Sequence, residues 1–285
     1  MLKQFKYKDI VWLDLESPTL NEIDSVSRQY KIHPLVLSEL ASPSERSKVD
    51  VYSEFIYLVL HFPTSEGGQE IDFILGRDFI ITTHYELMNP LNDFAKIFET
   101  DFMLKKNGEK IHAGFIFFYI IKEIYSALET NLGIINKQLK SIEQKVFSGH
   151  EREVVAMLSS LNRQLLEYQW TMKSHKEILD SLTLAGEDLF GVKFHYYLQA
   201  TCGEDRKMWK MIENSRETFN DLRNTNESLL SIKTNETMRV LTVLAAVFLP
   251  LNIVAQLYGA SNLSFILMGV FFIAGIWLAK AKQWL

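Results

Sequence analysis

The chain has 285 residues, of which 47% are hydrophobic and 23% are charged, with a formal net charge of −5 and one cysteine. This length can hold one or two domains with a proper core, while one cysteine excludes an internal disulfide framework and suits a reducing compartment. The acidic balance and the lack of a clustered basic face argue against nucleic acid as a partner.

Residues 1–110 are predicted to form a cytoplasmic α/β domain. Residues 10–15 have the composition of a strand, a Ser-Pro-Thr turn precedes a helix that starts near Leu20, and a second helix covers residues 33–41. Short runs rich in β-branched and aromatic residues follow, separated by glycine-containing turns. This pattern predicts antiparallel strands at residues 55–62, 71–75 and 79–84.

Residues 111–234 are predicted to form a cytoplasmic helical region that ends in a stalk helix. Helical periodicity predicts two long helices, at residues 111–147 and 151–182. The apolar run from Phe115 to Ile121 is too short to cross a membrane, and we expect it to face a soluble core.

A third helix is predicted to be exceptionally long. Between Gly203 and Pro250 the chain has neither glycine nor proline, so nothing interrupts a helix that continues into the apolar C-terminal region. About 60 residues at 1.5 Å each would form a rod of about 90 Å. A rod of this length favours lateral association, and a bundle of identical copies is the simplest arrangement.

Residues 235–285 are predicted to form a transmembrane hairpin. Residues 240–279 contain no Asp, Glu, Lys, Arg or His, and they include apolar runs at about 240–258 and 263–279. About 20 apolar residues cross a bilayer as a helix. The alternative is a buried hairpin of a soluble protein, which rarely lacks charge over such a length. Basic residues flank the hairpin on both sides, which predicts that both termini are cytoplasmic: Lys233, Arg239, Lys280 and Lys282.

Polar side chains of the first membrane helix share one face. At 100° per residue, Asn235, Thr242, Asn252 and Gln256 fall within an arc of about 100°. Polar side chains at membrane depth face protein or water rather than lipid. They therefore mark either a contact between helices or the lining of a pore, in which amide and hydroxyl oxygens replace part of the hydration shell of a cation.

Several segments resemble the CorA family of divalent-cation transporters. The resemblance is carried by the sequence Thr-Asn-Glu-Thr-Met-Arg-Val-Leu-Thr at residues 234–242, by Phe-Leu-Pro-Leu at 248–251, and by Leu-Tyr-Gly at 257–259. His-Pro-Leu at 33–35 and the basic ending Lys-Gln-Trp-Leu at 282–285 are also similar to the family.

The resemblance implies an α+β cytoplasmic funnel domain, a stalk helix, two C-terminal transmembrane helices and a homopentamer in the bacterial inner (plasma) membrane. It implies transport of a divalent cation, by default Mg²⁺, with Co²⁺, Ni²⁺ and Zn²⁺ as further candidates and no resident cofactor. It also implies a set of pore-lining positions that agrees with the polar face: Asn235, Met238, Leu241, Ala246, Leu249, Asn252 and Gln256.

The sequence departs from the family at the predicted selectivity mouth. The family signature is Gly-Met-Asn, whereas this chain has Gly259, Ala260 and Ser261, with Asn262 one residue later. The acidic outer loop of the family is also missing, so nothing concentrates cations there. These changes keep open a zinc-transporting relative and a non-conducting, membrane-anchored protein that senses metal or binds a partner.

The sequence contains no enzyme motif, and we expect that the protein is not an enzyme. His195, Cys202, Glu204 and Asp205 are close in sequence, but their spacing matches no zinc motif, and a solvated segment is the better interpretation. Glu204 and Asp205 are the acids nearest to the position at which family members bind a regulatory ion. The sequence does not assign that site.

Overall fold

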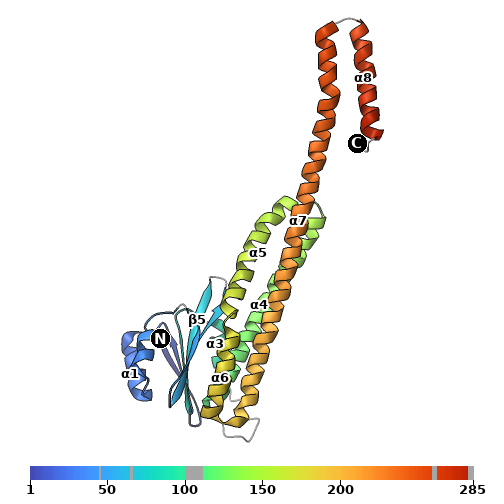
Figure 1. Ribbon diagram of the computed structural model, residues 1–285. Helices are drawn as coiled ribbons and strands as arrows, with labels where there is room; N and C mark the ends of the chain where they lie inside the picture. Colours follow the sequence, from blue (N-terminus) through green and yellow to red (C-terminus); the bar gives the residue numbers. More distant parts are fainter. Residues whose placement is uncertain (45, 65–66, 100–111, 259–261, 282–285) are drawn as a thin grey trace. The chain divides into compact units, whose positions relative to one another are not determined.

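The computed structural model describes residues 1–44, 46–64, 67–99, 112–258 and 262–281 (Figure 1). Contacts divide the chain into two compact units, each described here by itself. Unit 1 comprises residues 1–142 and 156–219, and unit 2 comprises residues 143–155 and 220–285.

Unit 1 contains a six-stranded sheet with the order β1-β2-β6-β5-β4-β3. The β2 and β6 strands are parallel, and all other neighbours are antiparallel. The predicted strands are confirmed. The two edge strands were not predicted, because β1 has no fully buried residue and mixes polar with apolar side chains, and β3 is only four residues long. The strands are β1 (Leu2–Tyr7), β2 (Ile10–Glu16), β3 (Lys48–Val51), β4 (Phe55–Pro63), β5 (Gly68–Gly76) and β6 (Phe79–His84).

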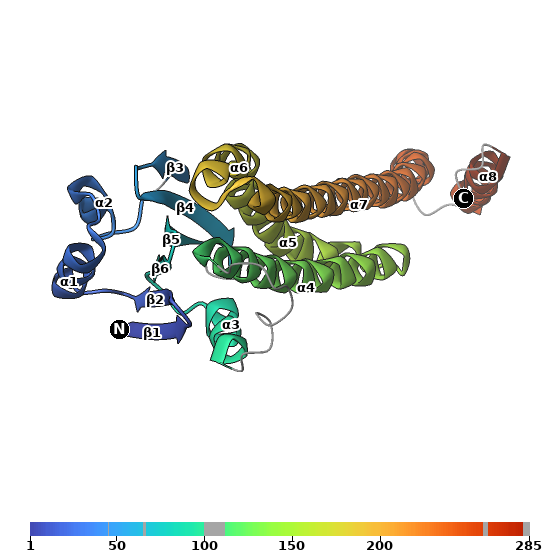
Figure 2. The ribbon, with the colours of Figure 1, turned by 90° about the horizontal axis from the view of Figure 1, so that it is seen from below.

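Helices α1 (Leu20–Tyr30) and α2 (Pro34–Glu39) cover one face of the sheet (Figure 2). The start of α1 is defined by a capping box in which Thr19 and Glu22 satisfy each other's backbone N–H groups. Proline at the first position of α2 suits a helix start, because its missing N–H would have no partner there. Both helices bury their apolar side against the sheet.

Helices α3 (Asn89–Glu99) and α4 (Ala113–Phe147) lie on the opposite face (Figure 2). Aromatic pairs join them to the strands: the ring centroids of Trp12 and Phe94 are 5.3 Å apart, and those of Phe73 and Phe117 are also 5.3 Å apart. Phe117 is fully buried, as are its neighbours one turn away, so one side of the apolar run at residues 115–121 faces the core of unit 1 as expected.

The prediction of one helix over residues 151–182 is wrong. Helix α5 (Glu151–Met172) ends, the chain turns at residues 173–174, and α6 (His175–Phe190) begins. The turn carries His175 into the core, where its Nε2 donates a hydrogen bond to the carbonyl oxygen of His61, 2.7 Å away. Helical periodicity could not reveal this break, because the partner of His175 is 114 residues away in the sequence.

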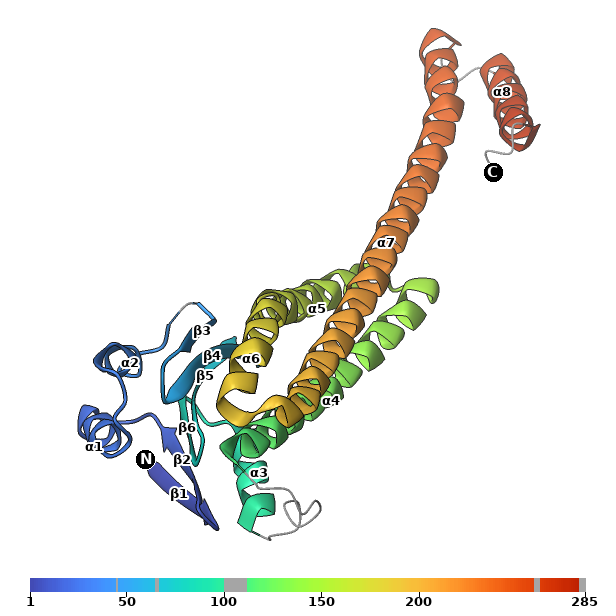
Figure 3. The same ribbon diagram turned by 60° about the horizontal axis from the view of Figure 1, so that its bottom comes forward.

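The long third helix is confirmed as α7 (His195–Tyr258), which follows a short 3₁₀ turn, η1 (Val192–Phe194), and α6 (Figure 3). It starts eight residues before Gly203, because a glycine weakens a helix without ending it. Within the described residues, one helix is long and apolar enough to cross a membrane, and it is this one.

In unit 2, the C-terminal part of α7 packs against α8 (Asn262–Ala281). Val243 and Val247 are buried, and Leu251 packs on them. An α+β part, one long helix and a C-terminal helical hairpin are the elements of the predicted fold class.

Candidate functional site: the polar face of helix α7

The candidate pore-lining residues lie on a face of α7 that the rest of the chain leaves exposed. Met238, Leu241 and Leu249 are 58%, 55% and 63% exposed. The other members of the predicted set are also exposed: Asn235, Ala246, Asn252 and Gln256. Large apolar side chains exposed in this way require either lipid or another protein surface.

The opposite face of the same helix is occupied. Val243 and Val247 are only 7% and 9% exposed, and they lie about 150° around the helix from the centre of the polar face. The hairpin partner α8 therefore covers the valine side and leaves the polar side free. Among the side chains that the structure describes, the amides of Asn235, Asn252 and Gln256 are exposed rather than buried against α8.

Two polar side chains of this face are tied to their own helix. Oγ1 of Thr242 donates a hydrogen bond to the carbonyl oxygen of Met238, 2.8 Å away, and Nδ2 of Asn252 donates one to the carbonyl oxygen of Phe248, 3.2 Å away. The bond of Thr242 uses its only hydroxyl hydrogen and that of Asn252 uses one of its two amide hydrogens, so the oxygens of both side chains stay available as acceptors. Oxygen acceptors are what a hard divalent cation or its water shell requires.

Pro250 adds a backbone oxygen near the same face. Proline has no N–H, so inside α7 it removes the hydrogen bond that residue 250 would donate to the carbonyl of Ala246. Ala246 belongs to the predicted pore set and is exposed. The carbonyl oxygen of Ala246 therefore lacks its usual helical donor.

The predicted selectivity mouth lies largely outside the described residues. Gly259, Ala260 and Ser261 are not described, and Asn262 is the first residue of α8. The role of these four positions stays a prediction.

The side chains that are close in sequence near residue 200 have different hydrogen-bond partners in the structure. His195 hydrogen-bonds Glu187, Sγ of Cys202 lies 3.5 Å from Oγ1 of Thr183, and Asp205 bonds Tyr125. Glu204 is half-buried beside them. Among the described residues, no group of three or more His, Cys, Asp or Glu side chains is placed to hold a metal ion. We therefore propose no metal role for Glu204 or Asp205.

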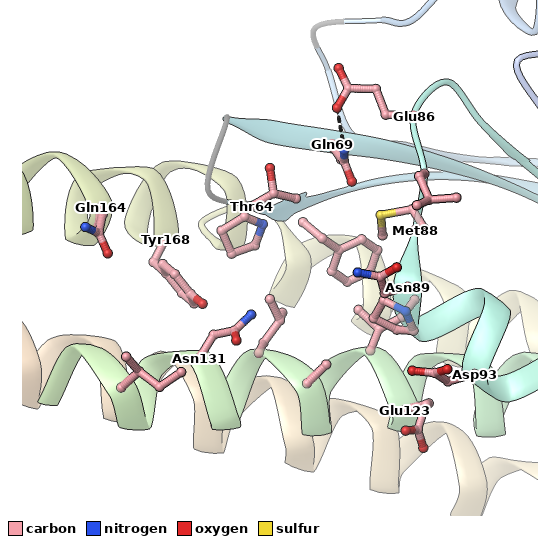
Figure 4. A pocket seen from close by; sticks show the side chains of 18 of the residues that line it. Thr64, Gln69, Glu86, Met88, Asn89, Asp93, Glu123, Asn131, Gln164 and Tyr168 are labelled. Carbon is pink, nitrogen blue, oxygen red and sulfur yellow. Dashed lines mark hydrogen bonds between the residues drawn. The ribbon is translucent and has the colours of Figure 1, made fainter. Parts of the chain in front are cut away.

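Unit 1 also contains a cleft that the sequence did not indicate. It has a volume of about 1020 Å³ and lies between the ends of β4 and β5, the start of α3, and the helices α4 and α5 (Figure 4). Asn131, Gln164 and Tyr168 face into it from the helices, and Glu86 hydrogen-bonds Gln69 at its rim. Its lining residues are brought together from five elements, so no local motif could reveal it.

Comparisons with known proteins agree with this architecture. The chain is 23% identical over 319 residues to the cobalt/magnesium transport protein CorA of Thermotoga maritima, and the match covers 99% of this chain and 89% of the relative. It is 22% identical to the CorA protein of Methanocaldococcus jannaschii, with 90% of this chain and 82% of the relative covered.

Solved structures show the same fold. The complete structure of the CorA magnesium transporter from Methanocaldococcus jannaschii superposes with a TM-score of 0.84 at 18% identity, covering 99% of this chain and 93% of that one. The full-length CmaX protein gives a TM-score of 0.77 at 15% identity, covering 96% and 89%.

The sequence matches the family described as CorA-like Mg²⁺ transporter protein over residues 7–277. This family consists of membrane transporters, which confirms that the chain is not an enzyme. With nearly its whole length matched, the chain belongs to the CorA-like Mg²⁺ transporter family.

Proposed function

We propose that five copies of this chain form a pore for divalent cations in the inner (plasma) membrane, lined by the C-terminal part of α7 and with both termini in the cytoplasm. The observation that carries the proposal is the division of α7 into two faces. One face packs on α8 through Val243 and Val247, and the other presents oxygen acceptors that the chain itself leaves exposed. Membership in a family of cation transporters supports it.

A ring of α7 helices would place the exposed polar side chains of each copy in water instead of lipid. Exposed amides such as those of Asn252 and Gln256 are costly in lipid, and they are satisfied when they converge on a water-filled axis. Met238, Leu241 and Leu249 then form apolar rings along the same axis, which suits a gate that closes by excluding water.

Transport through such a pore needs no nucleotide. A divalent cation that enters a compartment held at an inside-negative potential gains about 4.6 kcal/mol per 100 mV, since each charge contributes about 2.3 kcal/mol. We propose Mg²⁺ as the main substrate because the related proteins carry magnesium in their names. Co²⁺, Zn²⁺ and Ni²⁺ are the alternatives that an ion comparison must include.

A non-conducting relative is the second candidate. The specific observation in its favour is the sequence Gly259-Ala260-Ser261 in place of the family signature, together with an uncharged segment from Tyr258 to Leu263. Such a protein would use the same assembly to anchor a domain that senses metal or binds a partner.

Ion flux into liposomes separates these candidates. Purified protein is reconstituted, and uptake of Mg²⁺, Zn²⁺, Co²⁺ and Ni²⁺ is followed for the wild type, Asn252→Leu and Gln256→Leu. The matched control is Leu244→Val, an exposed position about 130° from the centre of the polar face. Loss of flux in the two amide variants but not in the control supports the pore. Unchanged flux in both amide variants overturns the assignment of the pore face, and absence of flux for every ion supports the non-conducting candidate.

A further inference from the structure

Three buried polar side chains from three helices meet in the core of unit 1. The hydroxyl oxygen of Tyr125 on α4 lies 3.0 Å from Nδ1 of His175 on α6 and 3.2 Å from Oδ1 of Asp205 on α7. Their exposures are 2%, 0% and 3%. Such burial leaves bulk water little access to these groups, so their hydrogen bonds depend mainly on one another.

The directions of these hydrogen bonds follow from counting hydrogens. Nε2 of His175 donates its hydrogen to the carbonyl oxygen of His61, so in a neutral imidazole Nδ1 carries a lone pair and needs a donor. Burial lowers the pKa of His175 to about 4, which keeps the ring neutral. Tyr125 has one hydrogen and faces two acceptors, Nδ1 of His175 and the carboxyl group of Asp205.

An ionised Asp205 leaves this chain of groups one hydrogen short. If Tyr125 donates to the carboxylate, Nδ1 of His175 faces an oxygen lone pair, and if it donates to His175, the carboxylate faces one. An extra proton removes the conflict: Asp205 donates to Tyr125, Tyr125 donates to His175, and His175 donates to the backbone. A charged His175 beside an ionised Asp205 satisfies the same bonds, again with one added proton.

The surroundings of Asp205 allow a proton to arrive. The residue lies at the wall of a cavity of about 220 Å³ between α6 and α7. Charged and titratable groups of both signs line this cavity or lie beside it. The lining groups are Lys176 and Asp180 from α6 and Cys202 and Arg206 from α7. Outside the lining, Glu204 is the neighbour of Asp205 on α7, and Tyr125 and His175 lie on the buried side of Asp205. Burial outweighs the hydrogen bond from Tyr125 and raises the pKa of Asp205 to about 6.

We propose that Asp205, Tyr125 and His175 form a proton-binding site that joins the N-terminal part of α7 to α4 and α6, and that one bound proton completes their hydrogen bonds and tightens this contact. Above the pH at which Asp205 ionises, the carboxylate is better hydrated in the adjoining cavity than held by Tyr125. A consequence for transport rests on the proposed function, because α7 is also the helix that carries the candidate pore face thirty residues later.

The test compares the thermal unfolding of the full-length protein in detergent from pH 4 to pH 8 for the wild type and Asp205→Asn. The amide supplies the missing hydrogen at every pH. An acid whose pKa is higher in the folded than in the unfolded protein contributes stability below about 3.8 that is lost as the pH rises to about 6. We therefore expect the stability of Asp205→Asn to rise relative to that of the wild type between these two pH values. Above about pH 6, its folding equilibrium constant should be about a hundredfold larger.

Glu204→Gln is the matched control. It removes the neighbouring carboxylate of α7, which is not one of the three hydrogen-bonded groups, so its stability relative to the wild type should not rise over this pH range. A parallel gain for Glu204→Gln, or equal melting of the wild type and Asp205→Asn at all pH values, overturns the proposal. If Asp205→Asn fails to fold, hydrogen exchange of the wild type decides: protection of residues 117–132 and 195–212, corrected for the intrinsic rate, must fall between pH 5 and pH 8. These results do not depend on transport, so loss of the proposed pore would leave them unchanged.

Discussion

Gly275 of α8 lies directly against Val247 of α7, so closely that a β-carbon at this glycine would be 2.8 Å from Cγ2 of the valine. Valine is branched at Cβ and restricted to few rotamers in a helix, so it has little freedom to move aside. Small residues allow membrane helices to approach closely, where packing rather than the hydrophobic effect holds them together. This contact fixes which side of α7 faces its own hairpin partner.

Gly275→Leu is therefore expected to separate α7 from α8. Forcing a side chain into this space should lower the stability of the hairpin by about 1–3 kcal/mol. Unfolding in a mixed-detergent titration measures the change. Gly269→Leu is the control in the same helix, because its β-carbon would have nothing within 4 Å. Equal loss in both variants would contradict the close contact.

His61 and Glu70 are expected to make the stability of the α/β part depend on pH. Burial alone lowers the pKa of His61, but the hydrogen bonds with Glu70 and the Ser44 carbonyl outweigh burial, and the net pKa is raised above 6.5. The charged imidazole therefore contributes stability that is complete below pH 6.5 and is lost as the pH rises through the folded value. Thermal unfolding of the full-length protein between pH 6 and pH 8 measures it.

Glu70→Gln should flatten this dependence and cost about 1–3 kcal/mol at pH 6, since it removes a charge-assisted hydrogen bond from a buried site. Glu143→Gln is the control, because Glu143 is an exposed carboxylate on α4. A wild type whose stability does not fall between pH 6 and pH 8 relative to Glu70→Gln would refute the role of the pair.

Leu249→Asn should raise ion flux if the apolar rings of α7 close the pore. An amide at this exposed position would hold water where leucine excludes it, so we expect a several-fold higher basal uptake of Mg²⁺ into liposomes. The measurement uses a Mg²⁺-sensitive dye inside the vesicles. Phe248→Asn is the control, because Phe248 is similarly exposed but lies outside the polar arc. Reduced flux in Leu249→Asn alone would argue against a gate at this ring.

The double substitution Ala260→Met with Ser261→Asn should change ion preference. It restores the family signature after Gly259 and places an amide in register with the end of the first membrane helix. We expect competition by Co²⁺ against Mg²⁺ uptake to change by roughly tenfold, which corresponds to about 1.4 kcal/mol. Ala260→Met alone, which adds no amide, is the control. Identical competition curves for all three proteins would remove the mouth from the selectivity mechanism.

Much of the fold could be predicted from the sequence, because it depends on patterns within short segments of the chain. Forty uncharged residues and the absence of helix breakers after Gly203 predict a long helix and a hairpin, and β-branched runs between glycine turns predict the inner strands. The break between Met172 and His175 could not be predicted, because it depends on a hydrogen bond across 114 residues. The edge strand β1 was missed because its mixture of polar and apolar side chains, none of them fully buried, resembles a solvated segment.

The candidate pore face was accessible to sequence reasoning because a helical period places its members on one side of one helix. Which side of α7 meets α8 was decided only by tertiary packing, through the fit of Val247 on Gly275. The same holds for the proton site: Tyr125, His175 and Asp205 are separated by 50 and 80 residues, and no short motif joins them. Periodicity within one element acts over a few residues and can be read from the chain, whereas the matching of buried hydrogen-bond donors and acceptors depends on which elements the fold brings into contact.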